Sequence, residues 1–381
     1  MVFSTPLFLF YFLPIFLVLY YLSNHKIQNI ILLVFSILFY TWGAPKFIVI
    51  VLSSLFVDYY IIKKMSTLEN KSRKWYLIAS IILNTGFLLY FKYANFFVEN
   101  VNQVFEWFQL KPFEWTKVLL PIGISFFTFQ KMSYTIDVYR KNGYPLKSVF
   151  DYALYILMFP QLIAGPIVRF KEVEKQLYDR SENNGFDNRL VGFIRFTIGL
   201  SKKVLIANVL AEQADAIFAI SPDYYSSVSA WVGLLAYTFQ IYFDFSGYSD
   251  MALGLGKMIG YEFPENFNFP YISQSISEFW RRWHITLGNW MKDYIYIPLG
   301  GNRVKVSRMY LNLIIVFTVS GFWHGAAWTF VAWGAYHGLF LIADRLFLLK
   351  VYKKMGKIPS VILTFFFAIM GWVLFRSESL H

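Results

Sequence analysis

Long apolar segments run through the whole chain, with too few polar residues between them to surround a water-soluble core. Only 15% of the 381 residues are charged, whereas a soluble domain carries about 25%. A helix needs about 20 mostly apolar residues to cross a bilayer. The segments that meet this requirement are 3–22, 27–43, 46–62, 75–98, 118–138, 190–220, 228–250, 308–324, 327–349 and 358–375. We therefore predict an all-α, polytopic integral membrane protein surrounded by membrane lipid.

Two further segments, 150–168 and 270–300, are apolar but interrupted by proline, glycine and charged residues. Irregular backbone is tolerated at membrane depth only where protein or water covers it. These segments are therefore expected to be re-entrant or interfacial, which brings the expected total to about 10–12 helices. The sequence contains no internal repeat and no long linker, so residues 1–381 are predicted to form a single membrane domain.

Basic residues gather in short stretches between the apolar segments, namely 63–74, 139–149, 292–308 and 350–357. Lysine and arginine are enriched in the cytoplasmic loops of membrane proteins. Placing these stretches in the cytoplasm leaves the N-terminus and the loops near 99–117 and 221–227 outside. Lys202 and Lys203 fit this arrangement if 190–220 forms two shorter helices with a cytoplasmic break. The net charge of +12 follows from this pattern, and no nucleic-acid partner is expected.

The chain contains no cysteine. This excludes disulfides, a catalytic thiol, thiolate metal sites and an acyl-cysteine intermediate. The histidines and carboxylates also lack the spacing of a zinc site. We therefore expect neither a bound metal nor another resident cofactor.

Histidine is the side chain best suited to take and return a proton near neutral pH, and three of the five histidines lie in apolar segments. His324 stands between Gly321 and Gly325, small residues that let helix backbones approach closely. Its residue type fits a catalytic role and a packing role, bonded to a backbone carbonyl, equally well. His337 follows in the next apolar segment and is expected to serve packing.

His284 belongs to an unusual cluster, Trp280, Arg281, Arg282, Trp283 and His284. Cations placed together in this way bind phosphate or pyrophosphate, and the aromatic rings can stack on a base or a sugar. The alternative is an interfacial helix whose basic and aromatic residues anchor it at the membrane surface. The residue types leave both interpretations open.

Carboxylates inside membrane segments are costly, and they often mark ion or proton pathways. Asp58, Asp137 and Asp244 fall in or beside the predicted spans. They keep open a second function, that of a transporter or flippase for a polysaccharide or a lipid-linked precursor.

Several motifs occur together in a fixed order. They are Leu120–Gln130, Phe159–Ile167, a run from Tyr242–Asp250 through Glu278–His284 to Tyr296–Arg303, and Gly321–Ala326. The ordered set resembles the membrane-bound O-acyltransferase (MBOAT) family in its bacterial branch, and above all the membrane subunits of alginate O-acetyltransferases. Proteins of this kind usually continue past Gly371–Arg376 with further helices, so this chain is expected to lack the family's last C-terminal helices.

The resemblance implies a helical bundle around a central tunnel, with 270–300 as its re-entrant core. It implies that His324 matches the family's catalytic histidine and that His284 matches the second motif histidine, so both are expected to be catalytic. The residues expected to bind substrate are Trp280, Arg281, Arg282, Trp283, Asp293 and Trp323.

The activity implied by the resemblance is polysaccharide O-acetylation at the plasma membrane of a bacterium, as in alginate biosynthesis. The acyl group would come from a cytoplasmic thioester such as acetyl-CoA, which is a co-substrate rather than a bound cofactor. It would reach hydroxyls of an exported polysaccharide directly or through an extracytoplasmic, esterase-like partner protein. A catalytically silent scaffold that anchors such a partner is a further alternative.

Overall fold

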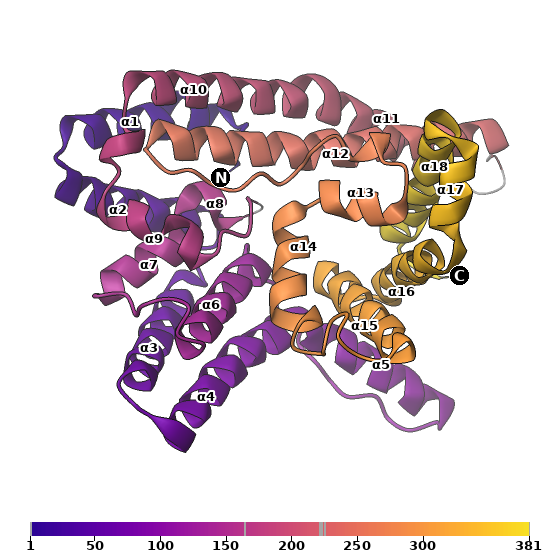
Figure 1. Ribbon diagram of the computed structural model, residues 1–381, viewed down its shortest axis with the longest axis horizontal. Helices are drawn as coiled ribbons and strands as arrows, with labels where there is room; N and C mark the ends of the chain where they lie inside the picture. The colour runs from indigo at the N-terminus through magenta and orange to yellow at the C-terminus, as the bar shows by residue number, and fades with distance from the viewer. Residues whose placement is uncertain (1, 164, 221–223, 225, 381) are drawn as a thin grey trace. The chain divides into compact units, whose positions relative to one another are not determined.

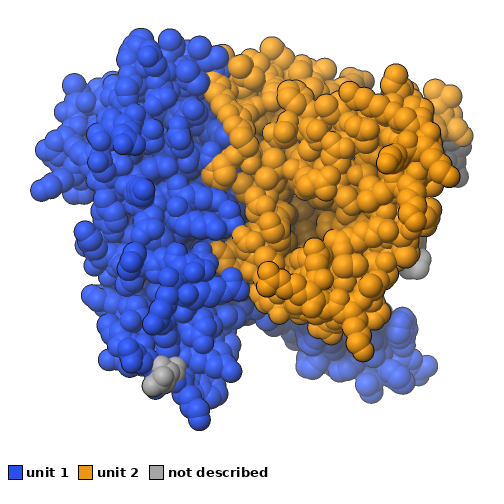
Figure 2. Space-filling view, viewed as in Figure 1, with its two compact units in different colours: residues 1–194, 252–263 blue, residues 195–251, 264–381 orange. Residues whose placement is uncertain are grey.

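The computed structural model describes residues 2–163, 165–220, 224 and 226–380. They divide into two compact units (Figure 2): unit 1 comprises 1–194 and 252–263, and unit 2 comprises 195–251 and 264–381. Every regular element in these residues is helical, which confirms the predicted all-α class. Ala164 in the second motif and most of the expected loop at 221–227 lie outside the described residues.

Unit 1 contains the first nine α-helices and the start of the tenth (Figure 1). They are α1 (Leu13–Leu22), α2 (His25–Gly43), α3 (Ile48–Ser66), α4 (Asn70–Leu88), α5 (Ala94–Trp107), α6 (Ile124–Tyr139), α7 (Val149–Leu157), α8 (Phe159–Leu162), α9 (Phe170–Tyr178) and α10 (Phe186–Ser201). A π-helical segment, Phe8–Phe12, leads into α1, and another, Leu89–Tyr93, joins α4 to α5. A 3-10 turn at Ser181–Asn183 precedes α10, through which the chain continues into unit 2.

Unit 2 contains the remaining helices, apart from the last turns of α12, which belong to unit 1. They are α11 (Asn208–Phe218), α12 (Ser227–Met258), α13 (Ile276–Arg282), α14 (Ile285–Met291), α15 (Val306–His324), α16 (Trp328–Ala343), α17 (Leu349–Met355) and α18 (Lys357–Arg376). Its π-helical segments are Lys202–Ala207, Lys292–Tyr296 and Asp344–Leu348, and a 3-10 turn lies at Pro270–Ile272. As expected for an interrupted segment, 270–300 forms short helices, and α13 and α14 meet at an angle (Figure 1).

Among the described residues, the helical runs long and apolar enough to cross a bilayer by themselves are His25–Gly43, Lys71–Trp107, Val306–His324 and Lys357–Arg376. Each overlaps a predicted span. The 37-residue run Lys71–Trp107 is about 55 Å long, well above the ~30 Å of the hydrocarbon core. Much of the loop expected at 99–117 is therefore helical. The helix continues through α5 because no proline or glycine interrupts residues 87–110.

Lys202 and Lys203 do not break the helix in which they lie. The run continues through α10, the π-helical segment Lys202–Ala207 and α11, so the expected cytoplasmic break is absent from the described residues here. The Lys202 ammonium lies 2.6 Å from the Asp250 carboxylate, and Lys203 pairs with Asp244. Because both cations find carboxylates on α12, the helix need not open to solvate them.

A buried ion pair lies in the core of unit 1. The Lys131 ammonium on α6 is 3.7 Å from the Asp58 carboxylate on α3, and neither side chain is more than 2% exposed. Asp58 also accepts hydrogen bonds from the Ser80 hydroxyl on α4, at 2.6 Å, and from the Tyr152 hydroxyl on α7, at 2.7 Å. Buried charges are tolerated when they are paired and hydrogen-bonded in this way. One carboxylate therefore links four helices.

In unit 2, α15 and α16 pack side by side as a close hairpin (Figure 1). A Cβ atom at Gly321 on α15 would collide with the backbone carbonyl of Phe330, and one at Gly334 on α16 would collide with the carbonyl of Phe317. Glycine at both positions lets the two backbones approach closely. This packing fixes the end of α15, where His324 is the last residue.

Candidate active site

His324 occupies a helix end rather than a continuous helix face. The chain leaves α15 at Gly325, whose backbone is extended, and passes through Ala326 and Ala327 into α16. Any side chain at Gly325 would collide with the ring of Phe330. His324 as a whole residue is partly exposed. Because His324 lies at the turn between two apolar helices, it is more accessible than a residue in the middle of either helix would be.

His284 lies in the junction between α13, which ends at Arg282, and α14, which begins at Ile285. Its backbone is left-handed, with φ 45°, a conformation that residues with a side chain seldom adopt. The side chain is 1% exposed, and neither ring nitrogen has a hydrogen-bond partner among the described residues. Such unpaired buried polar atoms indicate a place that a ligand or water completes.

The fold brings the two histidines together although 39 residues separate them in the sequence. The π-helical segment after α14 packs against α15, and the ring centroids of His284 and His324 are 6.3 Å apart. Trp323 lies beside both rings, at 4.9 Å from His324 and 6.1 Å from His284. Trp333 and Phe375 cover other faces of His324, at 5.2 and 5.4 Å. Aromatic side chains therefore surround the two imidazoles.

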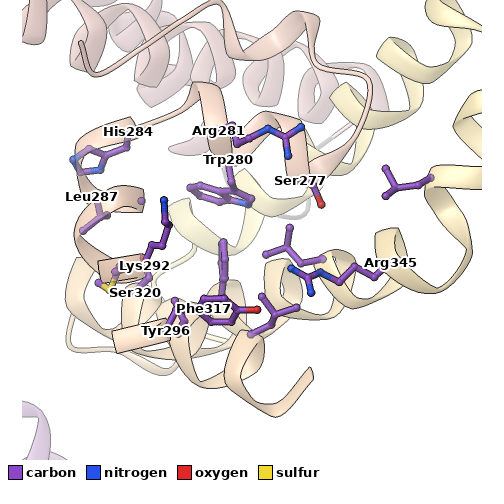
Figure 3. A pocket seen from close by; sticks show the side chains of 16 residues that line it. Ser277, Trp280, Arg281, His284, Leu287, Lys292, Tyr296, Phe317, Ser320 and Arg345 are labelled. Atoms are coloured by element: carbon purple, nitrogen blue, oxygen red, sulfur yellow. The ribbon is translucent and has the colours of Figure 1, made fainter. Parts of the chain in front are cut away.

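A cavity of about 430 Å³ adjoins His284 (Figure 3). Much of its wall is apolar, with contributions from Leu287 and from Phe317 on α15. Three cations from separate elements also line it, Arg281, Lys292 and Arg345, and none of the described residues that line it carries a carboxylate; a nearby one, Asp344, accepts the N–H of Ser277. Its volume is that of a small-molecule site, and its lining suits a ligand with both anionic and apolar parts.

Two residues that line this cavity carry buried polar atoms without partners. The indole Nε1 of Trp280 and both ring nitrogens of His284 are buried and lack a hydrogen-bond partner among the described residues, and both side chains line the cavity. Native structures leave few buried polar groups unsatisfied. The rings of Trp280 and His284 therefore keep unused hydrogen-bonding capacity beside the cavity.

The residues predicted to bind substrate fall into two groups. Trp280 and Arg281 line the cavity, whereas Arg282, Trp283, Asp293 and Trp323 do not. The Arg282 guanidinium donates instead to the Glu278 carboxylate, at 2.9 Å, and to a backbone carbonyl. Trp283 stacks on Phe279 and lies 4.8 Å from the ring of Trp372. Arg282 and Trp283 thus fix α13 in place, while Trp280 and Arg281 face the cavity.

Sequence reasoning missed two of the three cavity cations. From the sequence, Lys292 is only part of a cytoplasmic basic stretch, and Arg345 has no assigned role inside the predicted span 327–349. A charged residue within a predicted span is itself a functional signal, so the sequence alone could have marked Arg345 as a candidate site residue. Tyr296 and Ser277 also line the cavity, but no pattern in the sequence distinguishes them from their neighbours.

The remaining candidate histidine and the intramembrane carboxylates lie outside the cavity lining. His337 is 1% exposed and packs between Trp280 and Trp333, at 4.9 and 5.0 Å, in keeping with the expected packing role. Asp58 and Asp244, which support the transporter alternative, each lie against a lysine in their own unit. Within the described part of the chain, no group of three or more histidine, aspartate or glutamate side chains is placed to hold a metal ion.

Comparison with known proteins gives consistent matches over the whole chain. A model described as MBOAT, the membrane-bound O-acyltransferase family, matches residues 46–379. The chain is 45% identical to a "Probable alginate O-acetylase AlgI" of Pseudomonas aeruginosa and 46% identical to one of Pseudomonas putida. These matches cover 100% of this chain and 73% and 78% of the two relatives. It is also 39% identical to a "Peptidoglycan O-acetyltransferase" of Helicobacter pylori, covering 100% of this chain and 78% of that relative.

Proposed function

The chain belongs to the membrane-bound O-acyltransferase family and is an O-acyltransferase of a bacterial membrane, and from this premise we propose that it moves an acetyl group from a thioester donor to hydroxyls of an exported cell-surface polysaccharide. The observation that carries the proposal is the pair of imidazoles, His284 and His324, 6.3 Å apart beside a basic cavity. The acetyl group and the polysaccharide class are those in the relatives' names.

The basic cavity is the proposed donor site. An acyl thioester such as acetyl-CoA combines anionic phosphates with a long neutral arm, which matches the cations and the apolar wall. Arg281, Lys292 and Arg345 would hold phosphate oxygens through charge-assisted hydrogen bonds. The free N–H of Trp280 and the ring of His284 lie on the same cavity, where they would meet the thioester end.

His324 is the proposed general base. It would take the proton from an acceptor hydroxyl as the oxygen attacks the thioester carbonyl. The tetrahedral intermediate then collapses: the new C–O ester bond remains, the C–S bond breaks, and the leaving thiolate takes up the proton from His324, which regenerates the base. His284 would donate a hydrogen bond to the developing oxyanion, which is most effective where water is excluded. Binding donor and acceptor together supplies a further large part of the rate.

The ends of the helices support a donor that enters from the cytoplasm. Both α15 and α18 begin beside basic stretches, 292–308 and 350–357, and the cavity is lined by Lys292 and Leu349 at this same end. His324 terminates α15 at its other end, about 28 Å away along the helix. In the proposed orientation the N-terminus lies outside the cell, the cavity opens to the cytoplasm, and the acceptor approaches His324 from outside.

This orientation predicts opposite labelling of two engineered cysteines. Ser66 ends α3 in the basic stretch 63–74, and Glu114 is exposed near the end of the expected outer loop. In the cysteine-free chain, Ser66→Cys should react with an impermeant maleimide only in inverted vesicles, and Glu114→Cys only in intact cells. Labelling of both cysteines from one side would overturn the orientation.

Transfer would be completed directly or through an extracytoplasmic, esterase-like protein that receives the acetyl group outside. Proteoliposomes that contain only this chain distinguish the two routes. Acetylation of oligomannuronate added on the acceptor side would support direct transfer. Consumption of acetyl-CoA without formation of acetylated oligomannuronate would support a relay if adding a periplasmic extract then restored the acetylation.

Removing a cavity cation should weaken donor binding. Lys292→Gln and Arg345→Gln are each expected to raise the KM for acetyl-CoA by about tenfold, since a charge-assisted hydrogen bond contributes about 1.5–3 kcal/mol. The measurement is transfer of radiolabelled acetyl in proteoliposomes at varied acetyl-CoA. Arg303→Gln is the matched control, because Arg303 lies exposed in the same basic stretch and does not line the cavity. An unchanged KM in both cavity variants would exclude this cavity as the donor site.

A further inference from the structure

His284 has a backbone conformation that its neighbours must enforce. A residue with a side chain at φ 45° is strained, and such strain persists only where the surroundings fix it. His284 is also the N-cap of α14, yet its side chain makes no capping hydrogen bond. The first N–H groups of a helix need acceptors, so these must come from elsewhere in unit 2.

Asn266 supplies them. Its backbone carbonyl accepts the N–H of Ile285 at 2.9 Å, and its side-chain Oδ1 accepts both the N–H of Thr286, at 3.3 Å, and the Thr286 hydroxyl, at 2.9 Å. The Asn266 amide donates in turn to the Ser249 hydroxyl on α12, at 3.1 Å. Asn266 is 1% exposed. One buried side chain therefore caps α14 and ties it to α12.

The segment around Asn266 is anchored on both sides. Asn268 donates its backbone N–H to the carbonyl of Arg282 at 2.9 Å, just before His284. Glu265 pairs with Arg195, whose guanidinium also lies 2.9 Å from Asp250 on α12. Bonds to residues 282 and 285 thus bracket His284 from one segment, which is held on α12 by an ion-pair network.

We infer that Asn266 is a positioning residue, which holds the junction of α13 and α14 so that the imidazole of His284 faces His324. The inference rests on the proposed role of His284 in acetyl transfer. It assigns the buried amide a task that Asn268, two residues away, does not share. Asn268 is exposed, and its contacts described above run through its backbone.

The test combines kinetics with the spectrum of the histidine rings. Asn266→Ala is expected to lower kcat by up to about 100-fold, the effect of a misplacement near 1 Å, with the KM for acetyl-CoA unchanged. Asn266→Asp keeps the acceptors for Thr286, and the Ser249 hydroxyl can turn to donate to it, so this variant should recover most of kcat. Asn268→Ala should behave as wild type.

The spectroscopic readout needs no substrate. In bilayers that contain the full chain labelled with ¹³C,¹⁵N-histidine, the His284 ring signals are assigned by their loss in His284→Gln. They should shift in Asn266→Ala and stay in place in Asn268→Ala. Wild-type kcat with unmoved ring signals in Asn266→Ala would overturn the inference, as would equal losses in both alanine variants. Shifted His284 signals together with a fully active His284→Gln would instead support the positioning and refute the catalytic role proposed for His284.

Discussion

Replacing His324 by alanine is expected to reduce acetyl transfer by on the order of 10²–10⁴-fold, the usual contribution of a general base. Rings of Trp323, Trp333 and Phe375 lie within 5.5 Å of His324 and are not bases, and the imidazole of His284, 6.3 Å away, has the separate task of bonding to the oxyanion in the proposed mechanism. The loss should appear in kcat rather than in the KM for acetyl-CoA, because His324 does not line the donor cavity. The measurement is radiolabelled acetyl transfer to oligomannuronate by purified protein in proteoliposomes.

A second histidine variant controls for the loss of an imidazole as such. His25 begins α2 in unit 1, and His25→Ala should transfer acetyl at the wild-type rate. Full activity of His324→Ala would contradict the proposed mechanism. If the folded His324→Ala protein fails to acetylate polysaccharide even when the periplasmic extract is present, the scaffold alternative fails as well, since a scaffold needs no base.

The largest expected effect on stability belongs to the buried pair in unit 1. Asp58→Ala leaves the Lys131 ammonium uncompensated in a site where the lysine is only 2% exposed, and breaking a buried pair in this way costs about 3–5 kcal/mol. It also removes the acceptor of the Ser80 and Tyr152 hydroxyls. We expect a lower midpoint of thermal unfolding and poor recovery of folded protein, both measured by size-exclusion chromatography in detergent.

Two comparisons separate charge burial from the loss of any ion pair. Adding Lys131→Met to Asp58→Ala should restore part of the lost stability, because no charge then remains buried. Glu99→Gln removes an exposed pair, in which the Glu99 and Lys117 side chains are 58% and 81% exposed, and should cost less than about 1 kcal/mol. An equal loss of stability in Asp58→Ala and Glu99→Gln would show that the buried pair contributes no more to stability than an exposed pair does.

The sequence predicted closely where α15 ends and α16 begins. The spans expected at 308–324 and 327–349 correspond to α15, which ends at His324, and to the run that begins with α16 at Trp328. Local signals suffice here, because the length of an apolar segment and the small residues around 325–327 determine where the helices in that same stretch of chain end and begin. Where the expectation of a break at Lys202 and Lys203 was wrong, the reason was non-local: carboxylates on α12 pair with both cations.

The sequence could not tell which arginine of the adjacent pair faces the cavity. Neighbouring residues on a helix point about 100° apart, so the choice depends on how α13 is rotated. That rotation follows from the stacking of Trp283 on Phe279 and from the Arg282–Glu278 pair. These contacts direct Arg281 to the cavity, and Lys292 and Arg345 join it from other elements.

By itself, the sequence determined that this protein is a helical membrane protein, and its ordered motifs determined the family and the candidate histidines. Apolar length and residue identity are properties of short segments, so they can be read without the fold. Only the tertiary structure decided that His284 and His324 lie 6.3 Å apart, that a basic cavity borders one of them, and that Asn266 caps the helix beside it. Those relations join residues far apart in the chain, and packing between helices, rather than any local preference, sets them.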